Sequence, residues 1–281
     1  MVTKAILLNY ISSLRYRTII EGELDNSSDV LVVLHLYYPD MWDYFESNLG
    51  KIGSYDLLVT TSLVNHKKLP ANITSRANTK VVYTTNRGRD ILPFLTAVNS
   101  VDIHKYKAIL KLHTKKSPHY EDGADWLDSM VEQLTSIDTN SVIDIFNKQP
   151  TIVGPAGQYM SLEVNFEANG TQLEKLLKGQ FSYGRIKHYT QTNRGDYGFF
   201  AGSMVWLAPK YLNNKLFKQP IYRFDLERGQ VDGTYAHAFE RAMTLQREIS
   251  DVPIFETDGE RIAQIKYDAG LIPEWSDKFR A

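Results

Sequence analysis

Hydrophobic and polar positions follow one another in blocks that predict buried strands separated by amphipathic helices. The run VLVVLHLYY is almost wholly apolar and rich in β-branched residues, which is typical of a strand covered on both faces of a parallel sheet. Further blocks along the chain have the same character. The predicted strands are residues 30–38, 55–62, 80–86, 106–115, 151–157 and 197–208.

Helical periodicity fills most gaps between these strands. We expect Asp40 to cap a helix over 40–52, and Asp90 to cap one over 89–101. Pro93 suits the second helix because a missing N–H costs little in a first turn. Further helices are predicted at 126–135, 141–149, 171–179 and 233–249. This alternation predicts an α/β fold of nucleotide-binding type, with a mostly parallel central sheet flanked by helices.

The chain lacks an internal boundary, so the sequence predicts a single domain over 1–281. Its first twenty residues are amphipathic, and we expect 1–29 to carry an N-terminal helix that packs on the core or lies on a membrane surface. Residues 30–245 form the predicted core, and we expect residues 246–281 to form a C-terminal extension that wraps around it.

Composition and charge exclude several classes of function. The 32 Lys and Arg residues nearly balance 33 Asp and Glu residues, so the net charge of −1 argues against a nucleic-acid partner. The absence of cysteine excludes disulfides, thiolate nucleophiles and cysteine-based zinc sites. No apolar run reaches the ~18 residues of a membrane span, and we expect a cytoplasmic protein. P-loop, dinucleotide-fingerprint and nucleophile-elbow motifs are missing as well.

Candidate chemistry begins just after the third predicted strand, with Asn86, Arg87, Arg89 and Asp90. Gly88 permits a tight turn between them. In open α/β sheets, ligands bind beyond the carboxyl ends of the strands, which is where these residues fall. Asp90 could simply cap a helix while the arginines are solvated. Alternatively, an arginine and the helix N-terminus bind part of a nucleotide diphosphate.

The end of the fourth predicted strand carries a second polar cluster, formed by Lys111, His113, Lys115 and Lys116. A two-residue period places Lys111 and His113 on one face of the strand. Four such groups within six residues could clamp a diphosphate, although a basic loop can also be merely solvated.

The C-terminal half adds two more candidate groups. Gly202 and Ser203 interrupt an aromatic run, which indicates either close approach of a ligand or plain packing. Glu227, Asp232 and His237 lie across a loop and the start of a helix. Asp232 is either the cap of that helix or a catalytic carboxylate, and His237 could be structural.

These blocks together resemble the rhamnan synthesis protein F (RgpF) family of bacterial polysaccharide glycosyltransferases. The resemblance covers about 30–245 and rests on VLHLYYPDMW, YDLLVTTS, NRGRDILPFL, ILKLHTKKS, GFFAGSMVWLAPKYL and GQVDGTYAHAFER, in that order. It implies a GT-A-like fold and an inverting glycosyltransferase. The implied reaction transfers a deoxysugar, with rhamnose favoured, from a dTDP-sugar to a growing surface polysaccharide such as rhamnan or O-antigen.

The resemblance also implies roles for the candidate residues. GT-A enzymes carry an acidic metal motif where this chain has Lys-Leu-His-Thr-Lys, so we expect metal-independent transfer, with Mg²⁺ or Mn²⁺ left open. Asp232 becomes the catalytic base, with Glu227 as its alternate. Gly202, Ser203 and His237 would bind the acceptor. The donor nucleotide sugar would be held by Asn86, Arg87, Arg89, Asp90, Lys111, His113, Lys115 and Lys116.

The implied acceptor is a lipid-linked glycan or an oligosaccharide. This would place the protein at the inner face of the plasma membrane, with peripheral membrane association, and it leaves room for further glycosyltransferase domains in a longer chain. Two alternatives stay open: a non-catalytic carbohydrate- or nucleotide-binding module of the same fold, and a transferase that uses phosphodiester-linked donors.

Overall fold

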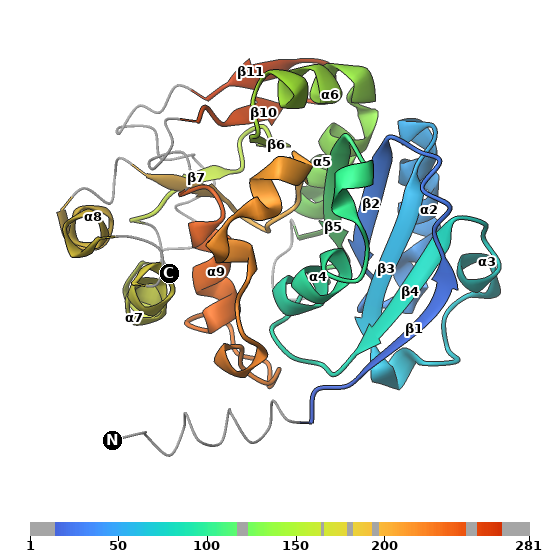
Figure 1. The fold of residues 1–281 in the computed structure, drawn as a ribbon, viewed down its shortest axis with the longest axis horizontal. Coiled ribbons are helices and arrows are strands. Elements are labelled where there is room, and N and C mark those ends of the chain that lie inside the picture. The colour runs from blue at the N-terminus through green and yellow to red at the C-terminus, as the bar shows by residue number, and fades with distance from the viewer. Residues whose placement is uncertain are drawn as a thin grey trace.

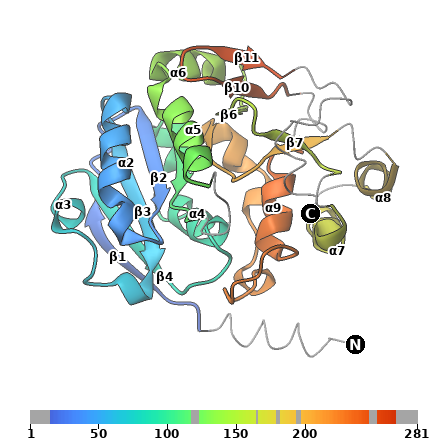
Figure 2. The same cartoon turned by 180° about the vertical axis from the view of Figure 1, so that it is seen from behind.

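A large mixed sheet with helices on both faces forms the body of the protein (Figures 1 and 2). The structure is a computed structural model, and it describes residues 15–116, 123–163, 166–178, 182–192, 197–245 and 252–265. The predicted α/β class, with a central sheet flanked by helices, is confirmed and is consistent with a GT-A-like fold.

The sheet has nine strands in the order β1-β4-β3-β2-β5-β9-β6-β10-β11. Its middle, β4-β3-β2-β5, is parallel, as is the pair β6-β10, whereas β1, β9 and β11 run antiparallel to their neighbours. A separate pair, β7-β8, is antiparallel. The strands are β1 (Thr18–Glu23), β2 (Val30–His35), β3 (Asp56–Ser62), β4 (Thr79–Thr84), β5 (Ala108–His113), β6 (Ile152–Pro155), β7 (Tyr159–Ser161), β8 (Gly198–Phe200), β9 (Val205–Leu207), β10 (Phe255–Thr257) and β11 (Ile262–Gln264).

Helix α4 contacts strands β2, β3 and β4, while α2 and α5 pack together behind the sheet (Figure 2). Helices α7 and α9 contact one another beside the sheet's C-terminal half. The helices are α2 (Trp42–Leu49), α3 (Ala71–Thr74), α4 (Ile91–Val98), α5 (Gly123–Ser136), α6 (Thr139–Lys148), α7 (Phe166–Leu177), α8 (Tyr183–Lys187) and α9 (Tyr235–Ala242). Among the described residues, no helix combines the length and apolarity needed to cross a membrane.

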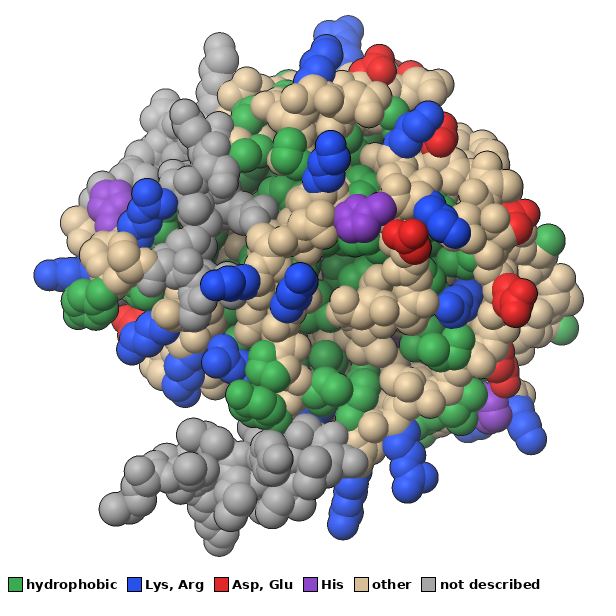
Figure 3. Space-filling model, in the orientation of Figure 1, with side chains coloured by type: hydrophobic (Ala, Val, Ile, Leu, Met, Phe, Trp, Pro, Cys, Tyr) green, Lys and Arg blue, Asp and Glu red, His purple; other side chains and the backbone are tan. Residues whose placement is uncertain are grey.

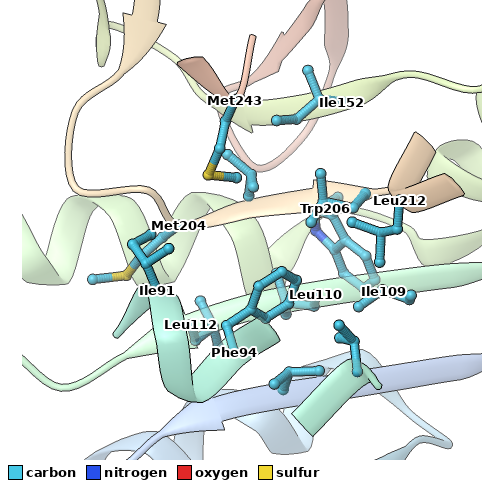
Figure 4. Close-up of a cluster of buried hydrophobic side chains, with 14 of the residues drawn as sticks. Ile91, Phe94, Ile109, Leu110, Leu112, Ile152, Met204, Trp206, Leu212 and Met243 are labelled. Carbon is cyan, nitrogen blue, oxygen red and sulfur yellow. The ribbon is translucent and has the colours of Figure 1, made fainter. Parts of the chain in front are cut away.

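The hydrophobic core is continuous across the sheet. Figure 4 shows side chains from α4, β5, β6 and β9 gathered in one cluster, with Ile91 and Phe94 of α4 among them. Every residue of β2, β3 and β5 is buried, as the apolar runs predict for parallel strands covered on both faces. This core fixes the strand ends that carry the polar candidates.

The predicted N-terminal helix is wrong where the structure describes it. Residues 18–23 form β1, an exposed edge strand paired antiparallel with β4. Thr18, Ile19 and Ile20 are β-branched and favour a strand, and the edge of β4 supplies the backbone partners that decide between the two structures. Residues 1–14, which carry most of the amphipathic pattern, lie outside the described residues.

The single strand predicted at 197–208 is two strands in different sheets. β8 pairs with β7, and β9 lies between β5 and β6. Between them, Gly202 has φ +85° and Ser203 has φ +54°, and these left-handed conformations turn the chain from one sheet to the other. The apolar pattern runs through this turn because both strands and the turn are largely buried.

None of the three aspartates considered as helix caps makes a capping hydrogen bond. Asp40 lies in a short 3-10 turn, Pro39–Met41, and α2 begins after it without a side-chain cap. Thr234, rather than Asp232, caps α9, and its Oγ1 accepts from the backbone N–H of His237 at 3.4 Å. Asp90 does occupy the N-cap position of α4, but its carboxylate makes no capping hydrogen bond.

The C-terminal segment joins the sheet instead of only wrapping around it. β10 pairs parallel with β6, and β11 closes the sheet edge. Helix α9 ends at Ala242, shorter than the predicted 233–249, of which 246–249 lie outside the described residues. Residues 266–281 also lie outside them.

Candidate functional site

A buried ion pair forms the centre of the candidate site, at the carboxyl edge of the parallel strands. Lys111 of β5 is 1% exposed, and its ammonium contacts three acceptors. They are Asp90 Oδ2 at 2.5 Å, Ser203 Oγ at 2.8 Å and the Ser203 carbonyl at 2.9 Å. The Ser203 hydroxyl in turn donates to Asp90 Oδ2 at 2.8 Å. Lys111 therefore uses all three of its N–H donors inside the protein.

The charge on Asp90 is stabilised strongly by this arrangement. Burial alone would raise the pKa of its carboxyl, but the charge and the hydrogen bond of Lys111 outweigh it and hold the pKa well below its usual range. Its second oxygen, Oδ1, has no hydrogen-bond partner within the described part of the chain. Asp90 thus presents a permanently ionised carboxylate, 16% exposed, at the edge of the sheet.

The turn from β4 into α4 aims Asp90 and Arg89 by means of unusual backbone conformations. Gly88 has φ +67°, and a Cβ at that position would lie 2.6 Å from Leu92 Cβ and 2.8 Å from Phe224 Cδ1. Arg89 has φ +54°, which costs a non-glycine residue about 1–3 kcal/mol. Strained backbone of this kind is found at functional sites, and Ser203 shares it.

Arg89 links the turn to the segment that precedes α9. Its guanidinium donates to Glu227 Oε2 at 3.2 Å, to the Gln230 carbonyl at 2.8 Å and to His237 Nε2 at 2.8 Å. Because arginine only donates, His237 Nε2 accepts this hydrogen bond, and Nδ1 lies 2.8 Å from Thr234 Oγ1 and 3.3 Å from the Thr234 backbone N. Burial and the neighbouring Arg89 lower the pKa of His237 to about 4, so this imidazole is neutral near pH 7.

His113 and Glu240 hold the Gly202 turn from opposite sides. His113 Nε2 donates to the Gly202 carbonyl at 2.7 Å, and the Gly202 N–H donates to Glu240 Oε1 at 2.6 Å. Burial lowers the pKa of His113 and raises the pKa of Glu240, to which the charge of Asp90 also contributes. β5, the β8–β9 turn and α9 therefore meet at Gly202.

Lys115 lies in the loop after β5, with its ammonium 3.5 Å from the centre of the Trp126 ring. Burial lowers the pKa of Lys115 to about 8, with Arg89 acting in the same direction and Glu240 opposing it. Among the described residues it forms no ion pair with a carboxylate. Lys115 is thus a cation available at the edge of the cluster.

Asp232 lies between α7 and α9 and contacts a side chain of each helix. Its two oxygens accept from Asn169 Nδ2 at 3.0 and 2.9 Å, and Oδ2 lies 3.4 Å from Arg241 Nη2. Arg241 is buried and also donates to the His237 carbonyl at 3.0 Å. These contacts tie the two helices together through Asp232.

Most residues predicted for the site meet in this one cluster, which we call the strand-end cluster. It contains Arg89, Asp90, Lys111, His113, Lys115, Gly202, Ser203, Glu227 and His237, with Asp232 at its side. The predicted division into donor-binding and acceptor-binding residues stays a prediction.

Three predicted donor-binding residues lie elsewhere. Arg87 is 1% exposed, its backbone bridges to Leu226, and the charge of Asp225 acts on its buried guanidinium, so we assign it to holding the turn. Lys116 pairs with Asp40 at the surface. The Asn86 side chain lies 3.5 Å from the Tyr37 hydroxyl, to which its amide donates.

Sequence reasoning missed Glu240 and Trp126. Glu240 lies one helical turn after His237 on α9, and this spacing places both side chains on one face. That spacing was the available signal. The sequence pattern placed Trp126 only within an amphipathic helix. Its approach to Lys115 depends on how α5 packs, which local sequence does not show.

Within the described ranges, no group of three or more His, Asp or Glu side chains is arranged to hold a metal ion. At the strand end that carries an acidic motif in GT-A enzymes, the chain presents Lys111 and His113, both engaged in hydrogen bonds within the protein.

Comparison with known proteins identifies relatives over most of the chain. Two proteins of Xanthomonas campestris pv. campestris, each described as uncharacterized protein WxcX, are 31% identical over 223 residues (strain B100) and 29% identical over 225 residues (strain ATCC 33913). Each alignment covers 78% of this chain but only 31% of the relative, so the chain spans about a third of their length. No solved structure matches.

The protein-family comparison covers nearly the whole described core. Residues 2–247 match the family described as rhamnan synthesis protein F, which confirms the resemblance found in the sequence blocks. The match includes the β4–α4 turn, the end of β5, the Gly202 turn and α9, that is, every element of the strand-end cluster. The chain belongs to the rhamnan synthesis protein F family, whose role lies in polysaccharide biosynthesis.

Proposed function

We propose that this chain is a glycosyltransferase that moves a deoxysugar, with rhamnose favoured, from a dTDP-sugar to a growing bacterial surface polysaccharide, inverting the anomeric centre. The observation that carries the proposal is the strand-end cluster, which lies where α/β sheets bind their ligands and falls inside the family match.

The cluster offers distinct groups to the two ends of a nucleotide sugar. Lys115 and Arg89 are cations at its rim, and a leaving diphosphate would be stabilised by such charges. Lys111 is engaged by Asp90 and Ser203, so it acts by fixing the Asp90 carboxylate rather than by direct contact with phosphate. Asp90 Oδ1 is then directed at a sugar or ribose hydroxyl, which would donate to it.

We also propose that transfer needs no divalent metal. Support comes from the end of β5, where Lys111 and His113 stand in the place of an acidic motif. The same proposal includes a lipid-linked glycan or an oligosaccharide as the acceptor. It also includes peripheral membrane association at the cytoplasmic face and additional domains in a longer chain.

Ligand-dependent thermal unfolding tests the proposal directly. A ligand that binds only the folded state stabilises it by about 2.7 kcal/mol at 100 times its Kd. We expect dTDP to raise the melting temperature more than UDP, GDP or CDP, equally with Mg²⁺ and with EDTA. A shift seen only with Mg²⁺ would contradict metal-independent transfer but would still support a glycosyltransferase. No shift with any nucleotide would favour a non-catalytic carbohydrate-binding module.

A further inference from the structure

Three carboxylates border the strand-end cluster from the α9 side, and two of them have both oxygens in use. Glu227 accepts from Arg89 through Oε2 and from the Gly229 N–H through Oε1. Both oxygens of Asp232 accept from Asn169. Protonation of either carboxylate would remove the negative charge that strengthens these contacts.

Glu240 differs because, among the described residues, only one of its oxygens is hydrogen-bonded. Oε1 accepts from the Gly202 N–H at 2.6 Å, which fixes the side-chain direction. Oε2 forms an ion pair with Arg241 Nη1 at 3.7 Å, a separation too long for a hydrogen bond. The side chain is 18% exposed, and Oε2 has no hydrogen-bond donor among the described residues.

Charged groups face Glu240 from every element around it. Asp90 stands at the start of α4, Lys115 follows β5, and Arg241 is its neighbour on α9. Burial raises the pKa of Glu240, and Asp90 adds to that effect, while Arg241 and Lys115 oppose it. A carboxylate with a raised pKa is a stronger base, as a general base working near neutral pH requires.

We propose that Glu240, in place of Asp232, accepts the proton of the attacking acceptor hydroxyl. The inference rests on the proposed function. The hydroxyl oxygen forms a bond to the anomeric carbon while the bond from that carbon to the diphosphate oxygen breaks. The bonding pair leaves with the diphosphate, and the hydroxyl proton passes to Glu240 Oε2 and later to solvent. Asp232 is then a positioning residue that ties α7 to α9.

The test compares Glu240→Gln with Asp232→Asn, using Glu167→Gln as the matched control. The side-chain amide of the Glu240→Gln variant keeps an oxygen that accepts from Gly202, so the turn should persist, and thermal unfolding would check it. Glu167 is an exposed carboxylate in the first turn of α7 and forms no ion pair with a described residue of the cluster. The probes are dTDP-rhamnose as donor and octyl rhamnoside as acceptor, with kcat and kcat/KM measured from pH 5 to 9.

We expect Glu240→Gln to lower kcat by at least ~10²-fold and to abolish the acid limb of the kcat/KM profile, with dTDP affinity unchanged. Glu240→Asp should keep the acid limb at a reduced rate, because it retains a carboxylate. Formate should restore part of the activity of Glu240→Ala. A residue that only supports the Gly202 turn would show neither the altered pH profile nor the rescue.

The outcomes separate this inference from the proposed function. Suppose that the wild type transfers sugar. If Glu240→Gln then keeps both the rate and the acid limb, or if Asp232→Asn alone removes that limb, Glu240 is not the base, while the proposed glycosyltransferase activity is retained. If the wild type neither binds a sugar nucleotide nor transfers from one, both proposals are overturned.

Discussion

At the scale of single residues, the chemistry of the site depends on which charges are paired inside the protein. Lys111 and Lys115 are four positions apart in one basic segment, yet Lys111 is buried against Asp90 and Lys115 lies over Trp126 at the rim. The same residue type therefore has two roles, one that organises a carboxylate and one that can meet a ligand.

Breaking the buried pair should cost much more stability than breaking a surface pair. Asp90→Asn leaves the Lys111 ammonium buried without a counter-charge, and we expect the free energy of unfolding to fall by about 3–5 kcal/mol. Lys107→Met breaks the exposed pair of Lys107 with Asp29 and should cost less than ~1 kcal/mol. Urea denaturation of both variants measures the difference, and equal losses would contradict a buried, organising role for Lys111.

Buried imidazoles should make the fold sensitive to mild acid. Burial lowers the pKa of His35 to about 4, whereas an unfolded histidine titrates near ~6.5. Between these values the unfolded chain binds more protons, so stability falls as the pH drops from about 6.5 towards 4, by up to ~1.4 kcal/mol per pH unit for one such group.

Urea denaturation at pH 7.0 and pH 5.0 checks this expectation in the wild type and in His35→Gln. The variant should lose less stability between the two pH values than the wild type does. His104→Gln, on an exposed 3-10 turn, should keep the wild-type difference and serves as the control. An unchanged pH dependence in His35→Gln would contradict a buried neutral imidazole.

At the scale of elements, the β4–α4 turn orients the side chains of Arg89 and Asp90. Its tightness comes from Gly88, which packs against Leu92 and Phe224, and from the backbone hydrogen bond of Gly88 N–H to the Asp225 carbonyl at 3.0 Å. The β4–α4 turn and the segment before α9 are thus held together, and the ion pair between Arg89 and Glu227 adds a second link between them.

A methyl group at Gly88 should disturb this unit. Gly88→Ala combines the cost of a positive φ with a clash against Leu92 and Phe224, and we expect a loss of about 2–4 kcal/mol. Gly53 also has a positive φ, but a Cβ there meets no atom within 4 Å, so Gly53→Ala should cost only ~1–2 kcal/mol. Thermal unfolding compares the two, and equal losses would show that packing at Gly88 is unimportant.

At the scale of the whole molecule, positive charge is unevenly distributed although the net charge is −1. Exposed basic side chains lie on α7, α8 and the nearby 3-10 turn Lys215–Phe217, and Figure 3 shows Lys and Arg side chains gathered on that side. Tyr183 of α8 is 69% exposed beside them. The exposed basic residues are Lys175, Lys178, Arg185, Lys187, Lys215 and Lys218.

If the proposed membrane association uses this side, the chain should sediment with vesicles containing phosphatidylglycerol and not with pure phosphatidylcholine, and salt should weaken the binding. The double variant Arg185→Glu, Lys187→Glu should bind at least ~10-fold more weakly, since each charge near an anionic surface contributes about 1 kcal/mol. Lys68→Glu with Lys148→Glu is the charge-matched control on other parts of the surface. Equal weakening by both pairs would reject a localised surface.

The α/β class, most of the buried strands and the polar positions at their ends can be predicted from the amino-acid pattern alone. Apolar β-branched runs are local signals, and the carboxyl ends of parallel strands lie at one edge of a sheet, so the pattern predicted that Asp90 and Lys111 lie at that edge, but not that they form a pair. Family membership came from the same blocks.

The partners of those residues follow from the packing of the folded chain and not from local sequence. Strand β1 forms because an edge of β4 is available, and 197–208 divides because neighbouring sheets compete for it. Local sequence cannot distinguish a solvated lysine from one held by a distant serine, nor a free carboxylate from one bound by Asn169. Lys111 and Ser203 are 92 positions apart, and Asp232 and Asn169 are 63 apart. Burial and pairing across such separations are properties of the packed chain.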